Sequence, residues 1–188
     1  TAEFVVENGT ILGTGPKRSP NTFLCTKKSY SNFVLELEFK VDAALNSGVQ
    51  IRGGVYGEDT EVKKKGSKKK KRHQAGRVRG YQVEIDPDTT RNRMWTGGIY
   101  DEARRGWLAD LSKNKLARDA FKPEQWNHFR IQAKGDEIKT WINGEFAVML
   151  RDSMDASGFI GLQVHGQNKD KGRAGKQGRW RNIRIKES

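Results

Sequence analysis

Phe33-Val34-Leu35-Glu36-Leu37-Glu38-Phe39-Lys40 alternates apolar and polar side chains from one residue to the next. This period of two is typical of a β-strand that buries one face and exposes the other. Leu35, Leu37 and Phe39 are therefore expected to face the core. The first prediction is therefore a fold that contains β-strands of this kind.

Further segments along the chain repeat this pattern. Turn signals separate them, and the strongest of these is Asn143-Gly144. The charged segment 101–122 predicts a long loop with one helical turn, and Ile183 and Ile185 are expected to point inward from the last strand. The further strands are expected at 49–52, 80–86, 97–100, 126–133, 137–142, 145–150, 158–165 and 178–186. Many short strands without an amphipathic helix predict an all-β sandwich or barrel.

The length and composition restrict the class of protein. A chain of 188 residues suits one domain, so we treat 1–188 as a single domain. No apolar run approaches the roughly 20 residues of a membrane span. Residues 1–4 show no signal-peptide pattern. A single cysteine, Cys25, excludes an internal disulfide.

The net charge of +13 is concentrated in one segment. Residues 63–72, bounded by Lys63 and Arg72, are almost all cationic and show no apolar periodicity. We expect a basic, flexible insertion at about 61–79 that is solvated and self-repelling. The alternative is contact with a polyanion, either an acidic polysaccharide or a nucleic acid.

The outward side chains of the predicted strands form a polar set. Amides, an arginine, carboxylates and a histidine suit hydrogen bonding to hydroxyl groups. The set therefore predicts a sugar-binding sheet face, with an ordinary solvated face as the alternative. Its members are Gln50, Arg52, Gln82, Glu84, Asp86, Gln163 and His165.

Three of these residues are candidates for proton transfer. Glu84 and Asp86 lie about 6.6 Å apart along one strand face. Their repulsion is expected to raise the pKa of one of them toward the range of a general acid or base, although a nearby Arg52 would oppose this. His165 can carry a proton near neutral pH, and a structural histidine is the alternative.

Aromatic residues supply the other part of a sugar site. Tyr100 and Trp107 lie in or beside loops, as does Trp95, and are candidates to stack on a sugar ring. We expect Trp126, Trp141 and Trp180 in the core instead, because they begin or lie within strands.

The sequence predicts no metal and no cofactor. The three histidines show no metal-ligand spacing, and neither a phosphate-binding loop nor a nucleophile elbow occurs. A structural calcium ion on acidic loop residues such as Asp86, Asp88 and Asp101 is the alternative, although no calcium-loop spacing is present.

An ordered set of motifs runs through nearly the whole chain. The motifs are Asn46-Ser47-Gly48-Val49-Gln50-Ile51-Arg52, Gly80-Tyr81-Gln82-Val83-Glu84-Ile85-Asp86, Thr96-Gly97-Gly98-Ile99-Tyr100, Trp126-Asn127, Trp141-Ile142-Asn143-Gly144, Gly158-Phe159-Ile160-Gly161-Leu162-Gln163-Val164-His165 and Arg181-Asn182-Ile183. Together they resemble the 3-keto-disaccharide hydrolase domain family. The resemblance implies a two-sheet antiparallel jelly-roll sandwich of the concanavalin A-like type. It also implies a bacterial, exported protein, periplasmic or secreted.

The resemblance further implies an enzyme that acts on glycosides oxidised at C3. A C3 ketone acidifies the C2 proton, so a base can remove it, the C1 substituent can leave, and water can then complete a net hydrolysis. We assign proton transfer to Glu84 or Asp86 and to His165. The candidate substrate-binding residues are Gln50, Arg52, Gln82, Tyr100, Trp107 and Gln163.

Three other functions compete with this one. A conventional glucanase is disfavoured because Pro87-Asp88-Thr89 follows Glu84-Ile85-Asp86, so the usual nucleophile and acid pair is not reproduced. A noncatalytic carbohydrate-binding, lectin-like module, including one for anionic glycans, would use the same polar face. A polyanion binder would use residues 63–72, and its affinity would fall steeply with salt.

Overall fold

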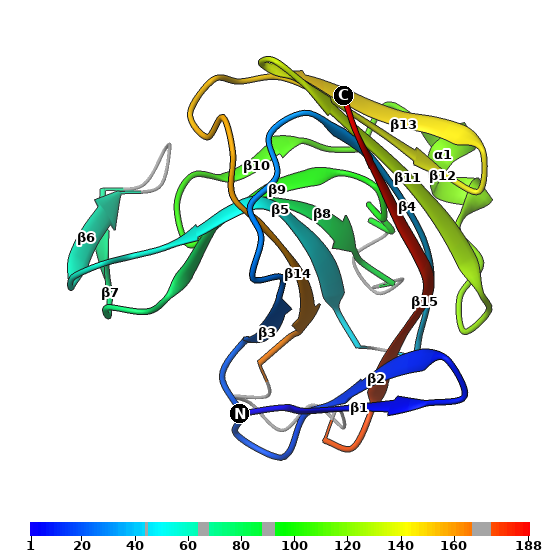
Figure 1. Ribbon diagram of the computed structural model, residues 1–188, viewed down its shortest axis with the longest axis horizontal. Helices are drawn as coiled ribbons and strands as arrows, with labels where there is room; N and C mark the ends of the chain where they lie inside the picture. The colour runs from blue at the N-terminus through cyan, green and yellow to red at the C-terminus, as the bar shows by residue number, and fades with distance from the viewer. Residues whose placement is uncertain (44, 64–67, 88–92, 167–173) are drawn as a thin grey trace.

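The computed structural model describes residues 1–43, 45–63, 68–87, 93–166 and 174–188. Two large sheets face each other, and a short hairpin stands away from them (Figure 1). The elements are β1 (Glu3–Glu7), β2 (Thr10–Thr14), β3 (Thr22–Cys25), β4 (Phe33–Val41), β5 (Ser47–Val55), β6 (Thr60–Lys63), β7 (Lys70–His73), β8 (Val78–Ile85), β9 (Ile99–Glu102), β10 (Gly106–Ala109), α1 (Lys115–Ala120), β11 (Asn127–Lys134), β12 (Glu137–Ile142), β13 (Glu145–Arg151), β14 (Phe159–Val164) and β15 (Gln177–Glu187).

The first sheet has seven strands in the order β1-β2-β15-β4-β11-β12-β13. β4 pairs antiparallel with β15 and with β11. Burial alternates along β4 residue by residue, so the quoted stretch behaves as predicted, with Leu35, Leu37 and Phe39 in the core. Asn143-Gly144 forms the predicted turn between β12 and β13.

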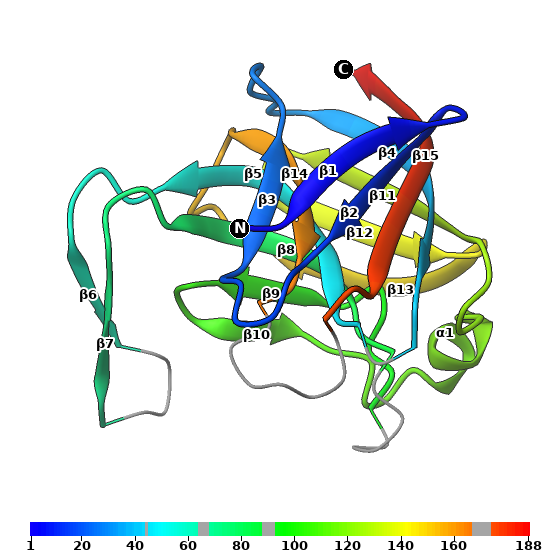
Figure 2. The same cartoon turned by 90° about the horizontal axis from the view of Figure 1, so that it is seen from below.

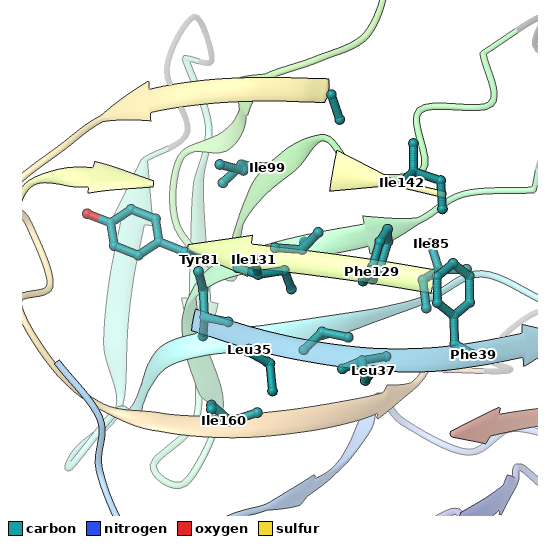
Figure 3. Packing of buried hydrophobic residues seen from close by; sticks show 14 of the residues in the cluster. Leu35, Leu37, Phe39, Tyr81, Ile85, Ile99, Phe129, Ile131, Ile142 and Ile160 are labelled. Atoms are coloured by element: carbon teal, nitrogen blue, oxygen red, sulfur yellow. The ribbon is translucent and has the colours of Figure 1, made fainter. Parts of the chain in front are cut away.

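The second sheet has six strands in the order β10-β9-β8-β5-β14-β3, and its neighbours are also antiparallel. Tyr81, Ile85 and Ile99 of this sheet meet Phe129 and Ile131 of the first sheet in one buried layer (Figure 3). Burial of these apolar side chains is the main favourable contribution to folding. The predicted all-β two-sheet sandwich is confirmed.

Two segments differ from the sequence-based prediction. The segment 101–122 contains β10, which pairs with β9, and the short helix α1, whose N-cap Asn114 accepts a hydrogen bond from the Ala117 amide. Ile183 does not point inward: its side chain is 41% exposed, because the pairing of β15 with β4 shifts register between Arg181 and Arg184. A one-residue bulge of this kind reverses the face on which the next side chain lies.

The tryptophans divide between the core and the surface. Trp180 is fully buried, as predicted. The prediction is wrong for Trp126 and Trp141, which are half-buried and carry the guanidinium groups of Arg181 and Arg130 at 3.9 and 5.6 Å from their ring centroids. Both rings cover the solvent side of the seven-stranded sheet.

The basic insertion is more ordered than the sequence predicts. β6 and β7 pair as a two-stranded hairpin, with Thr60 opposite His73 and Lys63 opposite Lys70, and it projects from the sandwich (Figure 2). Residues 64–67 lie outside the described residues. Among the residues that the structure describes, no helix is long and apolar enough to cross a membrane.

Candidate functional site

The polar face lies on the outer side of the six-stranded sheet. Gln50 of β5 is the register partner of Gln82 on β8, and Gly48 is the partner of both Glu84 and Gln163. Side chains opposite one another in adjacent strands share a face, so the three glutamines and Glu84 form one group. All four residues are buried although they face away from the apolar core. The alternation in the sequence correctly predicted that these four side chains share one face of the sheet.

The three glutamines leave several amide atoms unpaired. Gln82 Nε2 donates to Glu84 Oε1 at 2.9 Å and to Gln163 Oε1 at 3.2 Å. Within the described residues, both amide atoms of Gln50, Oε1 of Gln82 and Nε2 of Gln163 are buried without a partner. A buried polar atom without a partner costs about 1–3 kcal/mol. The group therefore presents donors and acceptors for a ligand with several hydroxyl or carbonyl oxygens.

Glycines give these amides their space. A Cβ at Gly48 would lie 2.6 Å from Gln82 Cγ, and one at Gly80 would lie 3.0 Å from Gln50 Nε2. Gly80 also has a φ of +120°, which side-chain-bearing residues rarely adopt. The glutamine side chains can thus lie across the neighbouring strands.

Glu84 is the titratable group at the centre of this face. It is 6% exposed, and the pKa of its carboxyl is raised to about 8, with burial as the largest cause. The negative charges of Glu102 and Asp86 also contribute to this rise, while hydrogen bonds from Asn46 and Gln82 act in the opposite direction. A carboxyl with such a pKa can exchange a proton near neutral pH.

Asp86 has a different environment from Glu84. Its carboxylate accepts a hydrogen bond from Arg93 Nε at 2.8 Å, and its backbone amide donates to Thr96 Oγ1 at 3.0 Å. The arginine compensates the buried charge of Asp86. The structure thus separates the two carboxylates: Asp86 positions Arg93, and Glu84 is the better candidate for proton transfer.

An aromatic wall borders the polar face at β9 and β10. Tyr100 is the register partner of Gln82 on one side and of Trp107 on the other. The Tyr100 and Trp107 rings meet edge to face at 5.4 Å, and Trp95 meets Trp107 at 4.9 Å. The Arg93 guanidinium lies 5.3 and 5.6 Å from the Trp95 and Trp107 centroids. Tyr100 and Trp107 are half-buried and stand beside the glutamines.

His165 lies immediately after β14, two residues beyond Gln163. Its Nδ1 is 2.9 Å from the carbonyl oxygen of Gly166, which can only accept a hydrogen bond. In the neutral ring, Nδ1 therefore carries the proton and Nε2 is the acceptor. The residue is half-buried and follows the last residue of β14.

Besides Arg93, four residues of this region were missed by the sequence analysis. Glu102 is buried on β9, two residues after Tyr100, and accepts from Asn21 Nδ2 at 3.1 Å. Arg77 forms an ion pair with the same carboxylate. Asn46 donates to Glu84 Oε2 at 3.1 Å. The two-residue spacing from Tyr100 was the available signal for Glu102, whereas Asn21 and Arg77 arrive from distant segments.

The family comparison decides what kind of domain carries this face. The family model described as the 3-keto-alpha-glucoside-1,2-lyase-like domain matches residues 1–186. The chain belongs to this family. The lyase-like domain is thus a carbohydrate-active or carbohydrate-binding β-sandwich, as its family indicates. No curated protein matches the sequence.

Solved structures share the fold of the lyase-like domain. A candidate glycosyl hydrolase from Parabacteroides distasonis ATCC 8503 matches with a TM-score of 0.61 at 21% identity, over 98% of this chain and 90% of its own. A protein of unknown function with a galectin-like fold from Bacillus subtilis gives 0.66 at 8% identity, over 99% and 86%. A carbohydrate binding module from Bacillus subtilis gives 0.57 at 12%, over 100% and 92%. The predicted concanavalin A-like jelly roll is confirmed.

Arg52 does not join the polar face of the lyase-like domain. The pairing of β5 shifts register after Ile51, and Arg52 has a φ of +45°. This bulge turns the side chain away from the line of Gln50. Its Nε donates to the Ser31 carbonyl at 2.8 Å and its Nη1 to the Gly135 carbonyl at 2.7 Å. The expectation that Arg52 lies beside Glu84 and holds hydroxyls is therefore corrected.

The acidic residues considered for calcium are bound to arginines. Asp101 accepts hydrogen bonds from Arg104 and Arg105, and Asp86 accepts one from Arg93. Asp88 lies outside the described residues. Calcium binding by the lyase-like domain stays a prediction.

Proposed function

We propose that the lyase-like domain cleaves glycosides whose sugar is oxidised at C3, with Glu84 as a proton-transfer group. The observation that carries this proposal is a buried carboxyl with a pKa of about 8 beside amide atoms that have no partner within the described residues. A site of this kind suits a ligand with several oxygen atoms and a proton to exchange.

The proposed reaction begins with elimination. Ionised Glu84 takes the C2 proton, the electrons of the C2–H bond form a C1=C2 double bond, and the C1–O bond breaks. His165 in its doubly protonated form gives the proton on Nε2 to the leaving oxygen, while its Nδ1–H stays bonded to the Gly166 carbonyl. Addition of water across the double bond then places hydroxyl at C1 and hydrogen at C2, which gives net hydrolysis.

The neighbouring groups support this chemistry by binding. Gln163 Nε2 is a donor without a described partner, so it suits the C3 carbonyl oxygen, which gains negative charge when C2 loses its proton. Gln50 and Gln82 offer the complementary atoms for hydroxyl groups. Tyr100 and Trp107 provide ring faces and edges on which the apolar side of a sugar packs.

The test is release of the C1 substituent from 3-keto-glycosides beside their unoxidised parents, with and without added divalent metal. We expect release from the keto sugars alone. Glu84→Gln keeps the shape of the side chain but cannot take a proton, so kcat should fall by about 100-fold or more. The matched control is Glu36→Gln at the half-exposed Glu36–Arg130 pair on the other sheet. Full turnover by Glu84→Gln would sink the assignment.

A noncatalytic carbohydrate-binding module is the second candidate. The unpaired amides of Gln50, Gln82 and Gln163 favour it equally, because binding alone satisfies them. This function predicts sugar affinity without release from any glycoside. Loss of affinity in Gln50→Ala, with no turnover in the native protein, would select it over the lyase.

A further inference from the structure

The projecting hairpin carries a dense positive charge. We call β6, β7 and their flanks the basic arm, meaning the described residues 58–63 and 68–77. These residues hold seven Lys or Arg side chains against three Asp or Glu. The arm stands away from both sheets in Figures 1 and 2, so most of these charges face solvent.

The pairing of the two strands concentrates this charge. Lys63 lies directly opposite Lys70, and like charges in such a pair destabilise a hairpin. Glu61 reaches Lys70 at 3.2 Å. Lys63, Lys68 and Lys71 have no acidic partner in the part of the chain that the structure describes. A bound anion would remove this repulsion.

The base of the arm is fixed to the sandwich. The buried His73 ring stacks on Tyr56 with the centroids 5.6 Å apart and the planes 10° from parallel. The Tyr56 hydroxyl donates to the Ala103 carbonyl at 3.1 Å, and the Ala75 amide donates to Asp59 Oδ1 at 3.0 Å. The arm therefore leaves the body in a defined direction.

A hollow of about 750 Å³ lies at this base. Its walls include the cationic Lys71, Arg72 and Arg77 and one carboxylate, Asp59, which pairs with Arg72 at 2.9 Å. Arg77 also pairs with Glu102 and lies 5.9 Å from the Phe23 ring centroid. Phe23 is the register partner of Gln163, so it belongs to the polar face. Arg77 thus joins the hollow to the polar face that holds Glu84.

We propose that the basic arm and the hollow at its base form an anion subsite, which binds carboxylate or sulfate groups of a glycan whose adjoining sugar occupies the polar face. This proposal rests on the proposed carbohydrate function of that face. A glycan fits better than a nucleic acid, because His73 is the only ring among the described residues of the arm and it is already stacked on Tyr56. Nucleic-acid binders stack bases on exposed aromatic rings.

The experiment compares two variants of equal charge. The arm variant is Lys68→Gln/Lys70→Gln/Lys71→Gln. The control is Lys113→Gln/Lys115→Gln/Lys122→Gln, which removes three exposed lysines at α1 and its flanks. Binding of polygalacturonate, dextran sulfate, neutral dextran and a single-stranded DNA oligonucleotide is measured by calorimetry at two salt concentrations.

We expect the native protein and the control to bind both anionic glycans more tightly than neutral dextran. The arm variant should lose at least about tenfold in affinity and most of its salt dependence, because surface charge attraction is screened by salt. Equal losses of glycan affinity in the arm variant and the control would overturn the proposal of a subsite at the arm. DNA binding as tight as glycan binding would overturn the assignment to glycans. Binding needs no turnover, so failure of the lyase reaction and failure of the arm are distinguishable.

Discussion

At the scale of single residues, the polar face depends on polar groups that are buried without all of their hydrogen bonds. Glu84 is the clearest case, since a carboxyl with a pKa of about 8 stays protonated at pH values where the unfolded chain ionises. Asp86, two residues away, is paired with Arg93 instead. The sequence predicted that one member of this pair would have a raised pKa, but the third carboxylate, Glu102, comes from β9 and could not be placed from sequence.

Glu84 makes the stability of the protein depend on pH. Its folded pKa is raised, so its contribution is intact below the unfolded pKa near 4.3 and is lost as pH rises through about 8. Glu84→Gln removes this loss. We expect the variant to match native stability near pH 4 and to exceed it by about 5 kcal/mol at pH 8.5. Urea unfolding at both pH values measures the difference, and parallel pH profiles would contradict the assigned pKa.

At the scale of elements, alternation in the sequence predicts the face of a side chain correctly only where the strand keeps its register. Alternation placed Gln50, Gln82 and Gln163 correctly because their strands stay regular there. It failed for Arg52 and Ile183, since each lies within a bulge that local sequence does not reveal. The basic arm was predicted as a flexible loop because it lacks apolar periodicity. A two-stranded ribbon with both faces in solvent does not need that periodicity.

The close contact of β5 with the Gln82 side chain gives an element-scale prediction. Gly48→Ala would place a Cβ 2.6 Å from Gln82 Cγ. The Gln82 side chain must then shift, which breaks its hydrogen bonds to Glu84 and Gln163. We expect a retained fold, a stability loss of about 1–3 kcal/mol and at least about tenfold weaker binding of the sugar. The control is Gly57→Ala, where a Cβ meets nothing within 4 Å. Unchanged sugar affinity in Gly48→Ala would show that the amide row is dispensable.

At the scale of the whole molecule, one buried guanidinium connects the two sheets. Arg52 belongs to β5 of the six-stranded sheet, while Gly135 lies in the turn between β11 and β12 of the seven-stranded sheet. Arg52 is 1% exposed, and its described hydrogen bonds to the Ser31, Gly135 and Asp155 carbonyls satisfy the buried charge. Burial lowers the pKa of the guanidinium, but it remains a cation. Arg52 therefore joins β5 of the six-stranded sheet to the β11–β12 turn of the seven-stranded sheet.

Replacement of Arg52 tests this connection against the role predicted from sequence. Arg52→Met keeps an unbranched stem but leaves the Ser31 and Gly135 carbonyls without their donor, so the free energy of unfolding should fall by about 3 kcal/mol. Arg130→Gln, at a half-exposed pair with Glu36, should cost about 0.5 kcal/mol or less. Urea unfolding and sugar titration are measured on both variants. Because Arg52 lies away from the amides, affinity in the folded Arg52→Met protein should be preserved; weaker binding with unchanged stability would instead return Arg52 to the polar face.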